Sequence, residues 1–174
     1  GGHYLESEWK DHSDFVQVMV TSVAHMTRLF LPEMVERNRG GIINVASLAG
    51  LVPGSPGHTL YGAAKAFLIK MTESLSFELQ DKGVQVTVCC PGFTYTEFHD
   101  VLGNRDQVSQ LPKAMWMKAE EVVSGALDTN ARGDVMHVPG MVNKGLAGMA
   151  KYLPYKLGLR VMSNSGKNVR SQEK

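Results

Sequence analysis

The chain has 174 residues, enough for one domain with its own core, and its 43% hydrophobic and 20% charged residues exclude a disordered protein. No stretch reaches the ~20 consecutive apolar residues that a membrane-spanning helix needs. The formal net charge is +1, but it is unevenly spread. Residues 1–143 hold 11 basic and 16 acidic groups, and residues 144–174 hold 7 basic and 1 acidic group.

The order of expected elements indicates an α/β fold. Hydrophobic periodicity and turn residues predict helix 13–38, strand 42–47, loop 48–58, helix 59–82, strand 84–90, an irregular stretch 91–117, helix 119–131, strand 134–138 and a tail. Such alternation of strands and helices favours a parallel sheet covered by helices. No internal repeat or interdomain linker interrupts it.

The only two cysteines, Cys89 and Cys90, are adjacent in the predicted strand 84–90. Neighbouring strand residues point to opposite faces, so the pair can form neither an ordinary disulfide nor a zinc site. This usage favours the reducing cytoplasm. The six histidines show no metal-ligand spacing, and we expect no metal.

Tyr61-Gly-Ala-Ala-Lys65 places a phenol and an ammonium four residues apart in the predicted helix 59–82, so the two side chains share a face. The unperturbed pKa of tyrosine is about 10, and a neighbouring positive charge favours the phenolate. We therefore expect Lys65 to lower the pKa of Tyr61, which would let Tyr61 act as an acid or a base near neutral pH.

Two loops that follow predicted strands carry further candidates. Strand 42–47 ends in the hydroxyl of Ser47, and strand 84–90 runs directly into Pro91-Gly92-Phe93-Thr94-Tyr95-Thr96. Open α/β sheets bind ligands outside the carboxyl ends of their strands. On the residues alone, Ser47 could equally cap local backbone, and Pro91-Gly92 is an ordinary turn.

Ser47, the Tyr61-x-x-x-Lys65 pair and Pro91-Gly92 with a following threonine together resemble the classical short-chain dehydrogenase/reductase family. The resemblance implies an α/β fold, the C-terminal part of a doubly wound, parallel-sheet Rossmann-type domain formed by residues 1–162. It also implies an NAD(P)-dependent oxidoreductase. Such an enzyme would transfer a hydride reversibly between NAD or NADP and a ketone or secondary alcohol.

The resemblance assigns roles to the matched residues. In the family, the tyrosine matched by Tyr61 exchanges the proton with the substrate oxygen, and the lysine matched by Lys65 lowers its pKa and holds the nicotinamide ribose. The serine matched by Ser47 hydrogen-bonds the same oxygen. By the same analogy, four more residues face the nicotinamide end: Pro91, Gly92 and Phe93 through their backbone, and Thr96 through its hydroxyl.

Two departures from the family pattern stand out. The strand, glycine-rich turn and helix that receive the pyrophosphate have no counterpart in this sequence. We therefore expect a fragment that binds a dinucleotide poorly by itself.

The second departure concerns proton delivery. The position of the family's usual catalytic asparagine falls on Met19, which has no amide to hold a relay water and could simply be a packing residue. A non-catalytic remnant or regulatory binding module of the same fold is the alternative function.

The resemblance also implies an assembly and a substrate region. Helices 13–38 and 59–82 would pair across a two-fold axis into a homodimer or homotetramer, and both carry apolar residues on more than one face. Residues 97–117, where the family places its substrate-covering segment, are rich in apolar side chains such as Trp116. They favour a lipophilic carbonyl or alcohol substrate, with packing into the core as the alternative.

The cationic C-terminal region has two interpretations. Leu146, Met149, Leu153 and Leu157 fall at helical steps, although Pro154 interrupts them. We expect a short helix packed on the domain, followed by a disordered basic tail over 163–174. Peripheral membrane contact by the tail is the alternative. The basic tail lacks the interleaved aromatic residues of a nucleic-acid site, so no nucleic acid partner is expected.

Overall fold

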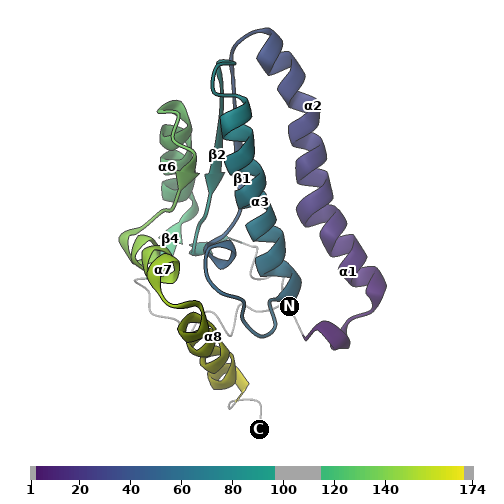
Figure 1. The fold of residues 1–174 in the computed structure, drawn as a ribbon, viewed down its shortest axis with the longest axis vertical. Coiled ribbons are helices and arrows are strands. Elements are labelled where there is room, and N and C mark those ends of the chain that lie inside the picture. Colours follow the sequence, from purple (N-terminus) through teal and green to yellow (C-terminus); the bar gives the residue numbers. More distant parts are fainter. Residues whose placement is uncertain (1–2, 97–114, 171–174) are drawn as a thin grey trace.

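The computed structural model describes residues 3–96 and 115–170, with side chains through Ser163 (Figure 1). The helices are α1 (Trp9–Val16), α2 (Ser22–Glu36), α3 (Thr59–Glu78), α6 (Ala119–Ala131), α7 (Met141–Tyr152) and α8 (Tyr155–Arg170), with a π-helical turn η2 (Gln17–Thr21) and 3-10 turns η1 (Tyr4–Glu6) and η3 (Leu48–Gly50). The strands are β1 (Gly40–Val45), β2 (Val84–Cys89), β3 (Phe93–Tyr95), β4 (Trp116–Lys118) and β5 (Met136–His137).

The main sheet is parallel, in the order β1-β2-β5, and a separate parallel pair joins β3 to β4. In Figure 1, α3 and α2 lie on one side of the sheet and α6 lies on the other. This arrangement confirms the predicted α/β fold with parallel strands. All carboxyl ends of a parallel sheet meet at one edge, so the loops after β1 and β2 lie together.

The core consists of small clusters on the two faces of the sheet. Leu68 and Ile69 of α3 pack with Val88 and Cys90, whereas Cys89 packs with residues of α6. The adjacent cysteines therefore point to opposite faces, as predicted. Both are free and buried. Burial raises the pKa of Cys89 to about 11 and that of Cys90 to about 12, so both thiols stay protonated at neutral pH.

A buried series of hydrogen-bonded side chains joins α2, β1 and α3. The hydroxyl of Thr27 donates to the amide oxygen of Asn44 at 3.4 Å, and the Asn44 amide nitrogen donates to the hydroxyl of Thr72 at 3.0 Å. Thr72 in turn donates to the carbonyl of Leu68 at 2.8 Å. Because buried polar groups are costly unless they are paired, this series favours one arrangement of the three elements.

Several expected boundaries were wrong. The helix expected over 13–38 begins at Trp9, changes to a π-helical turn over Gln17–Thr21 and ends at Glu36, where Asn38 takes a left-handed φ of 50°. The stretch 91–117, expected to be irregular, contains β3 and the first two residues of β4. Extended pairing of so few residues carries little periodic signal.

The C-terminal region differs from its prediction as well. Instead of one short helix and a disordered tail over 163–174, it forms α7 and then α8, which continues to Arg170. Pro154 lies between the two helices, where it ends the first and precedes the second. Residues 171–174 lie outside the described residues. No helix in the described ranges is long and apolar enough to cross a membrane.

Candidate active site

The loop after β1 carries Ser47. Ser47 caps the 3-10 turn η3, where its Oγ accepts the backbone N–H of Ala49 at 3.1 Å. Two backbone bonds then join this loop to the one after β2: Ala46 N–H donates to the Cys89 carbonyl at 2.7 Å, and Leu48 N–H donates to the Pro91 carbonyl at 2.9 Å. The structure therefore places Ser47 beside Pro91, as the parallel sheet predicts.

Gly50 lets the same loop lie directly on α3. A Cβ at this position would come 2.7 Å from the backbone carbon of Lys65 and 2.8 Å from the backbone nitrogen of Ala66. Real Cβ atoms do not approach backbone atoms so closely, so any larger residue would push the loop away from the helix. Contact at Gly50 thereby sets the distance between Ser47 and the side chains of α3.

Tyr61 and Lys65 lie one turn apart on α3, as the sequence predicts. The Tyr61 side chain is half-buried and hydrogen-bonded to that of Ser47. The Lys65 ammonium lies 5.7 Å from the centroid of the Tyr61 ring and donates to the Val45 carbonyl at 3.0 Å, at the last residue of β1. Ser47, Tyr61 and Lys65 thus converge at the carboxyl edge of the sheet.

The electrostatics differ from the expectation for this pair. Burial raises the pKa of Tyr61, and the hydrogen bond from Ser47 opposes that rise. Burial also lowers the pKa of Lys65, whose side chain is almost fully enclosed. Burial therefore outweighs the hydrogen bond from Ser47, and the phenol of Tyr61 is protonated at neutral pH. The expected lowering of the Tyr61 pKa by Lys65 is not what this structure shows.

The Pro91-Gly92-Phe93 turn leads from β2 into β3 beside Ser47. A Cβ on Gly92 would meet the side-chain amide of Asn143 at 2.5 Å from its Oδ1. Asn143 is buried on α7 and donates to the Pro139 carbonyl at 2.8 Å. Gly92 is therefore needed for α7 to dock on this turn. Thr96 is exposed at the end of the same described segment.

Aromatic rings from β3 and β4 pack against one another directly after this turn. Trp116 stacks on Tyr95 with a centroid distance of 4.8 Å, and it lies 5.6 Å from the ring of Phe93. The rest of the expected substrate segment, residues 97–114, lies outside the described residues. The structure thus brings Trp116 next to the turn that the sequence assigns to the cofactor end.

Met19 lies in the π-helical turn Gln17–Thr21 and is half-buried. This turn contacts α3, the helix of Tyr61 and Lys65. Single π turns inside α-helices occur frequently at functional sites. The sequence analysis found the departure at Met19 but not the change in helix geometry there, since periodicity does not separate a π turn from an α turn.

Two pockets lie near these elements, and Tyr61 lines neither of them. A pocket of about 440 Å³ lies between the loop after β1 and the α3 face that carries Gly62, Ala63 and Ala66. His58 lines this pocket and sets its ring edge-on to Tyr61 at 6.3 Å. Sequence reasoning missed His58, although its place three residues before Tyr61 in a helix start was a usable signal.

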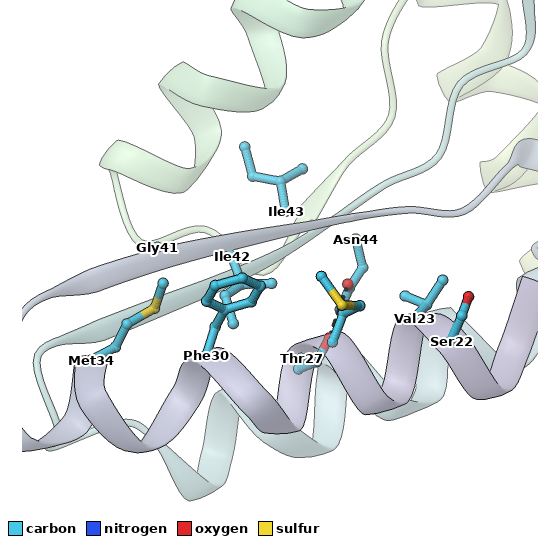
Figure 2. A pocket seen from close by; sticks show the side chains of 10 residues that line it. Ser22, Val23, Thr27, Phe30, Met34, Gly41, Ile42, Ile43 and Asn44 are labelled. Carbon is cyan, nitrogen blue, oxygen red and sulfur yellow. Dashed lines mark hydrogen bonds between the residues drawn. The ribbon is translucent and has the colours of Figure 1, made fainter.

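The second pocket, of about 500 Å³, lies between α2 and β1 (Figure 2). Phe30 and Met34 rise toward β1 from α2, whereas Ile43 points to the opposite side of the strand (Figure 2). Thr27 and Asn44, two of its polar residues, are bonded to one another. Its lining is mostly hydrocarbon, so this pocket suits packing rather than chemistry.

The described ranges contain no candidate metal site, because no three His, Cys, Asp or Glu side chains lie close enough together to bind an ion. Lys65 could instead contribute hydrogen-bond donors to an organic cofactor. An ammonium has three donor positions, and among the described residues one of them is used, by Val45. A buried ammonium with free donors, 5.7 Å from the centroid of the Tyr61 ring, fits the two hydroxyls of a ribose.

Comparison with known proteins gives a consistent result. The family described as short chain dehydrogenase matches residues 2–107. The 3-oxoacyl-[acyl-carrier-protein] reductase FabG of Haemophilus influenzae is 33% identical over 147 residues, which are 81% of this chain and 59% of that protein. The oxidoreductase UcpA of Escherichia coli is 32% identical over 95 residues, 55% of this chain and 36% of that protein. The chain thus spans roughly a third to three fifths of these relatives.

Solved structures agree with the fold. A structure from a study of 7beta-hydroxysteroid dehydrogenase stereoselectivity superposes with a TM-score of 0.77 at 27% identity, over 92% of this chain and 62% of that one. A short chain dehydrogenase from Burkholderia cenocepacia in complex with NADP superposes with a TM-score of 0.75 at 24% identity, over 93% of this chain and 64% of that one. The second likeness concerns the fold alone.

Proposed function

The chain belongs to the short chain dehydrogenase family, and from this premise we propose that it carries the catalytic residues of an NAD(P)-dependent oxidoreductase. The reaction is hydride transfer between the cofactor and a ketone or secondary alcohol. One observation carries the proposal: Ser47, Tyr61 and Lys65 converge at the carboxyl edge of the parallel sheet, with the phenol bonded to the serine and close to the ammonium.

The residues present fit the nicotinamide ribose end of the cofactor. Lys65 and the Tyr61 hydroxyl would hold the ribose, and the backbone of Pro91, Gly92 and Phe93 would border the ring. When bound, the nicotinamide supplies or accepts the hydride. NADP is the first form to test, because structures of similar fold hold NADP or NADPH.

Tyr61 would move the proton. Burial raises the pKa of Tyr61 above the usual value for a phenol, which already lies well above neutral pH. Tyr61 is therefore protonated and set to donate to a carbonyl oxygen, which favours reduction of a ketone. Ser47, which is hydrogen-bonded to the same phenol, would donate a hydrogen bond to that oxygen as negative charge develops. Met19 occupies the position where the family usually has an asparagine, and it has no amide to hold a relay water. A proton that replaces the one given up by Tyr61 would therefore arrive by another route.

The substrate proposed is lipophilic. Trp116, Phe93 and Tyr95 form an aromatic cluster beside the turn after β2, and such surfaces suit apolar ligands better than polyols. Two similar proteins are described by an acyl-carrier-protein reductase activity and by hydroxysteroid dehydrogenation. An acyl-chain or steroid-like ketone is therefore the class to test.

Assembly and completion of the sheet are further parts of the proposal. Phe67 and Phe77 lie exposed on the outer face of α3, and Val18 and Leu29 are exposed on the neighbouring helix. We expect these faces to pair with a second copy. Among the described strands β1 pairs on one side only, with Val45 57% exposed, so we also expect another part of the whole protein to lie against it.

The test uses the whole protein with NADPH and two ketones, one with an aliphatic chain and one polyhydroxylated. Tyr61→Phe should reduce kcat at least ~10²-fold. Cofactor binding, which Lys65 also supports, should weaken but remain detectable by fluorescence. Tyr4→Phe, a phenol outside this cluster, should behave as wild type. Turnover in Tyr61→Phe equal to wild type would overturn the catalytic role and favour a binding module. Faster turnover of the polyhydroxylated ketone would overturn the proposal of a lipophilic substrate but not the catalytic role of Tyr61.

A further inference from the structure

The C-terminal helices stand apart from the rest of the chain by their charge. Between Asp134 and Glu173 the sequence has six Lys or Arg residues and no Asp or Glu. This stretch contains both α7 and α8. In Figure 1 the two helices lie at the lower end of the molecule, where β1 and β2 end, and α8 projects away from the sheet.

On α7, apolar side chains are exposed along one face. Met141, Met149 and Tyr152, at positions i, i+8 and i+11, are 81%, 57% and 81% exposed, and this spacing places them on one stripe of a helix. Lys144 and Lys151, seven residues apart, are exposed beside that stripe. The Lys151 ammonium lies 5.8 Å from the centroid of the Tyr152 ring.

Helix α8 has the same character, and one side of it touches the candidate active site loop. Gly158 is buried, and a Cβ there would lie 2.9 Å from Cγ of Pro53, in the loop that leads to Tyr61. On the same helix, Tyr155 is 73% exposed and Leu159 is 37% exposed. Two basic side chains follow them in the same i, i+4 spacing, Lys156 and Arg160, and both are exposed.

Exposed apolar stripes bordered by Lys and Arg, on helices too polar overall to enter a hydrocarbon core, are the pattern of helices that lie in the interface of a bilayer. The absence of acidic residues adds attraction to anionic headgroups. Tyrosine suits that depth, because its ring is apolar and its hydroxyl polar. We propose that α7 and α8 form a docking surface for anionic lipid bilayers. Tyr152, Tyr155 and Leu159 enter the headgroup region, and the cations meet the lipid phosphates.

This docking has a consequence for the active site. Because α8 contacts Pro53, a protein held by this helix keeps the loop before Tyr61 close to the bilayer surface. Lipophilic ketones partition into that surface, so they reach the site without crossing water. This consequence alone rests on the proposed function; the lipid docking does not depend on activity.

The experiment is sedimentation of the whole protein with vesicles of phosphatidylcholine alone or mixed with phosphatidylglycerol. Binding is expected to the mixed vesicles and to fall with salt. Lys156→Glu/Arg160→Glu should weaken it by at least roughly tenfold, since each cation near an anionic surface contributes to the attraction. Arg39→Glu/Lys82→Glu changes the charge equally at the other end of β1 and β2, and it should bind as wild type.

A second variant tests the apolar contact. Tyr155→Ser/Leu159→Ser keeps every charge, and it should also bind the mixed vesicles several-fold more weakly. Circular dichroism and the thermal transition of each variant show whether it folds. Equal binding to both vesicle types, an equal loss in Arg39→Glu/Lys82→Glu, or duplex DNA that competes with the vesicles would each overturn the proposal. So would full binding by Tyr155→Ser/Leu159→Ser.

Discussion

The protonation of Tyr61 depends on two opposing effects of its surroundings. Burial raises its pKa, and the hydrogen bond with Ser47 lowers it. Removing the hydroxyl of Ser47 therefore leaves burial unopposed. A catalytic phenol with a higher pKa remains a competent acid at neutral pH but becomes a base only in more alkaline solution.

Ser47→Ala should accordingly shift the acidic limb of the alcohol-oxidation pH profile of the whole protein to higher pH. It should also lower kcat by roughly 10²-fold, through the lost donor to the substrate oxygen. A pH titration of phenolate absorbance measures the pKa of Tyr61, because the part of the signal that is lost in Tyr61→Phe belongs to this residue. An unshifted Tyr61 titration in Ser47→Ala would show that this hydrogen bond does not influence the phenol.

His137 predicts a pH dependence of stability. Its Nδ1 lies 3.0 Å from the hydroxyl of Thr129, and its buried Nε2 has no hydrogen-bond partner among the described residues. Burial lowers its pKa, Lys144 and Arg132 add to this effect, and Asp128 opposes it. The unfolded state therefore binds the proton more readily. The contribution of neutral His137 to stability is present above its unfolded pKa of about 6.5 and is lost as the pH falls through that value.

Urea unfolding at about pH 7.5 and about pH 5 measures this effect, the two values lying on either side of the histidine pKa. The loss of unfolding free energy on acidification should be larger for wild type than for His137→Phe, which keeps a ring but does not titrate. An equal loss in the two proteins would mean that His137 does not contribute to acid sensitivity.

At the scale of elements, the contact of loop and helix at Gly50 controls the site. Gly50→Ala puts a Cβ within 2.8 Å of the backbone of Lys65 and Ala66, and the loop must move. We expect the free energy of unfolding to fall by ~1–3 kcal/mol and turnover to fall at least ~10-fold, since Ser47 is displaced from Tyr61. Gly54→Ala, in the same loop with nothing within 4 Å, is the matched control. Wild-type turnover in Gly50→Ala would contradict this positioning role.

Much of the architecture follows from sequence patterns. Helix 119–131 coincides with α6, and the strand at 84–90 lies within one residue of β2, because each has a clear period and a glycine or charged boundary. The Tyr61 and Lys65 pairing also follows from helical spacing. Other features depend on tertiary contacts that no local pattern encodes. They are the burial that sets the pKa of Tyr61, the docking of Asn143 on Gly92 and the π turn at Met19.

For the whole molecule, the formation of a homodimer or homotetramer remains a prediction. Phe67 and Phe77 are 42% and 77% exposed on α3, and their apolar surface would be buried if this helix paired with a second copy. Sedimentation velocity at micromolar concentration should find a dimer or tetramer that Phe67→Asp/Phe77→Asp converts to monomer. Val123→Asp/Leu127→Asp, on the opposite layer in α6, should keep the assembly. A wild-type monomer would contradict the prediction.

An isotope label can follow the proposed hydride transfer from the nicotinamide and its dependence on the proton donor Tyr61. NADPH carrying deuterium at the reactive carbon of its nicotinamide is mixed with an aliphatic ketone and the whole protein, and the alcohol is examined by mass spectrometry. Wild type should place one deuterium on the former carbonyl carbon, and Tyr61→Phe should do so at a rate at least ~10²-fold lower. Cofactor that binds without passing deuterium to any ketone, or transfer as fast in Tyr61→Phe as in wild type, would contradict the proposed function.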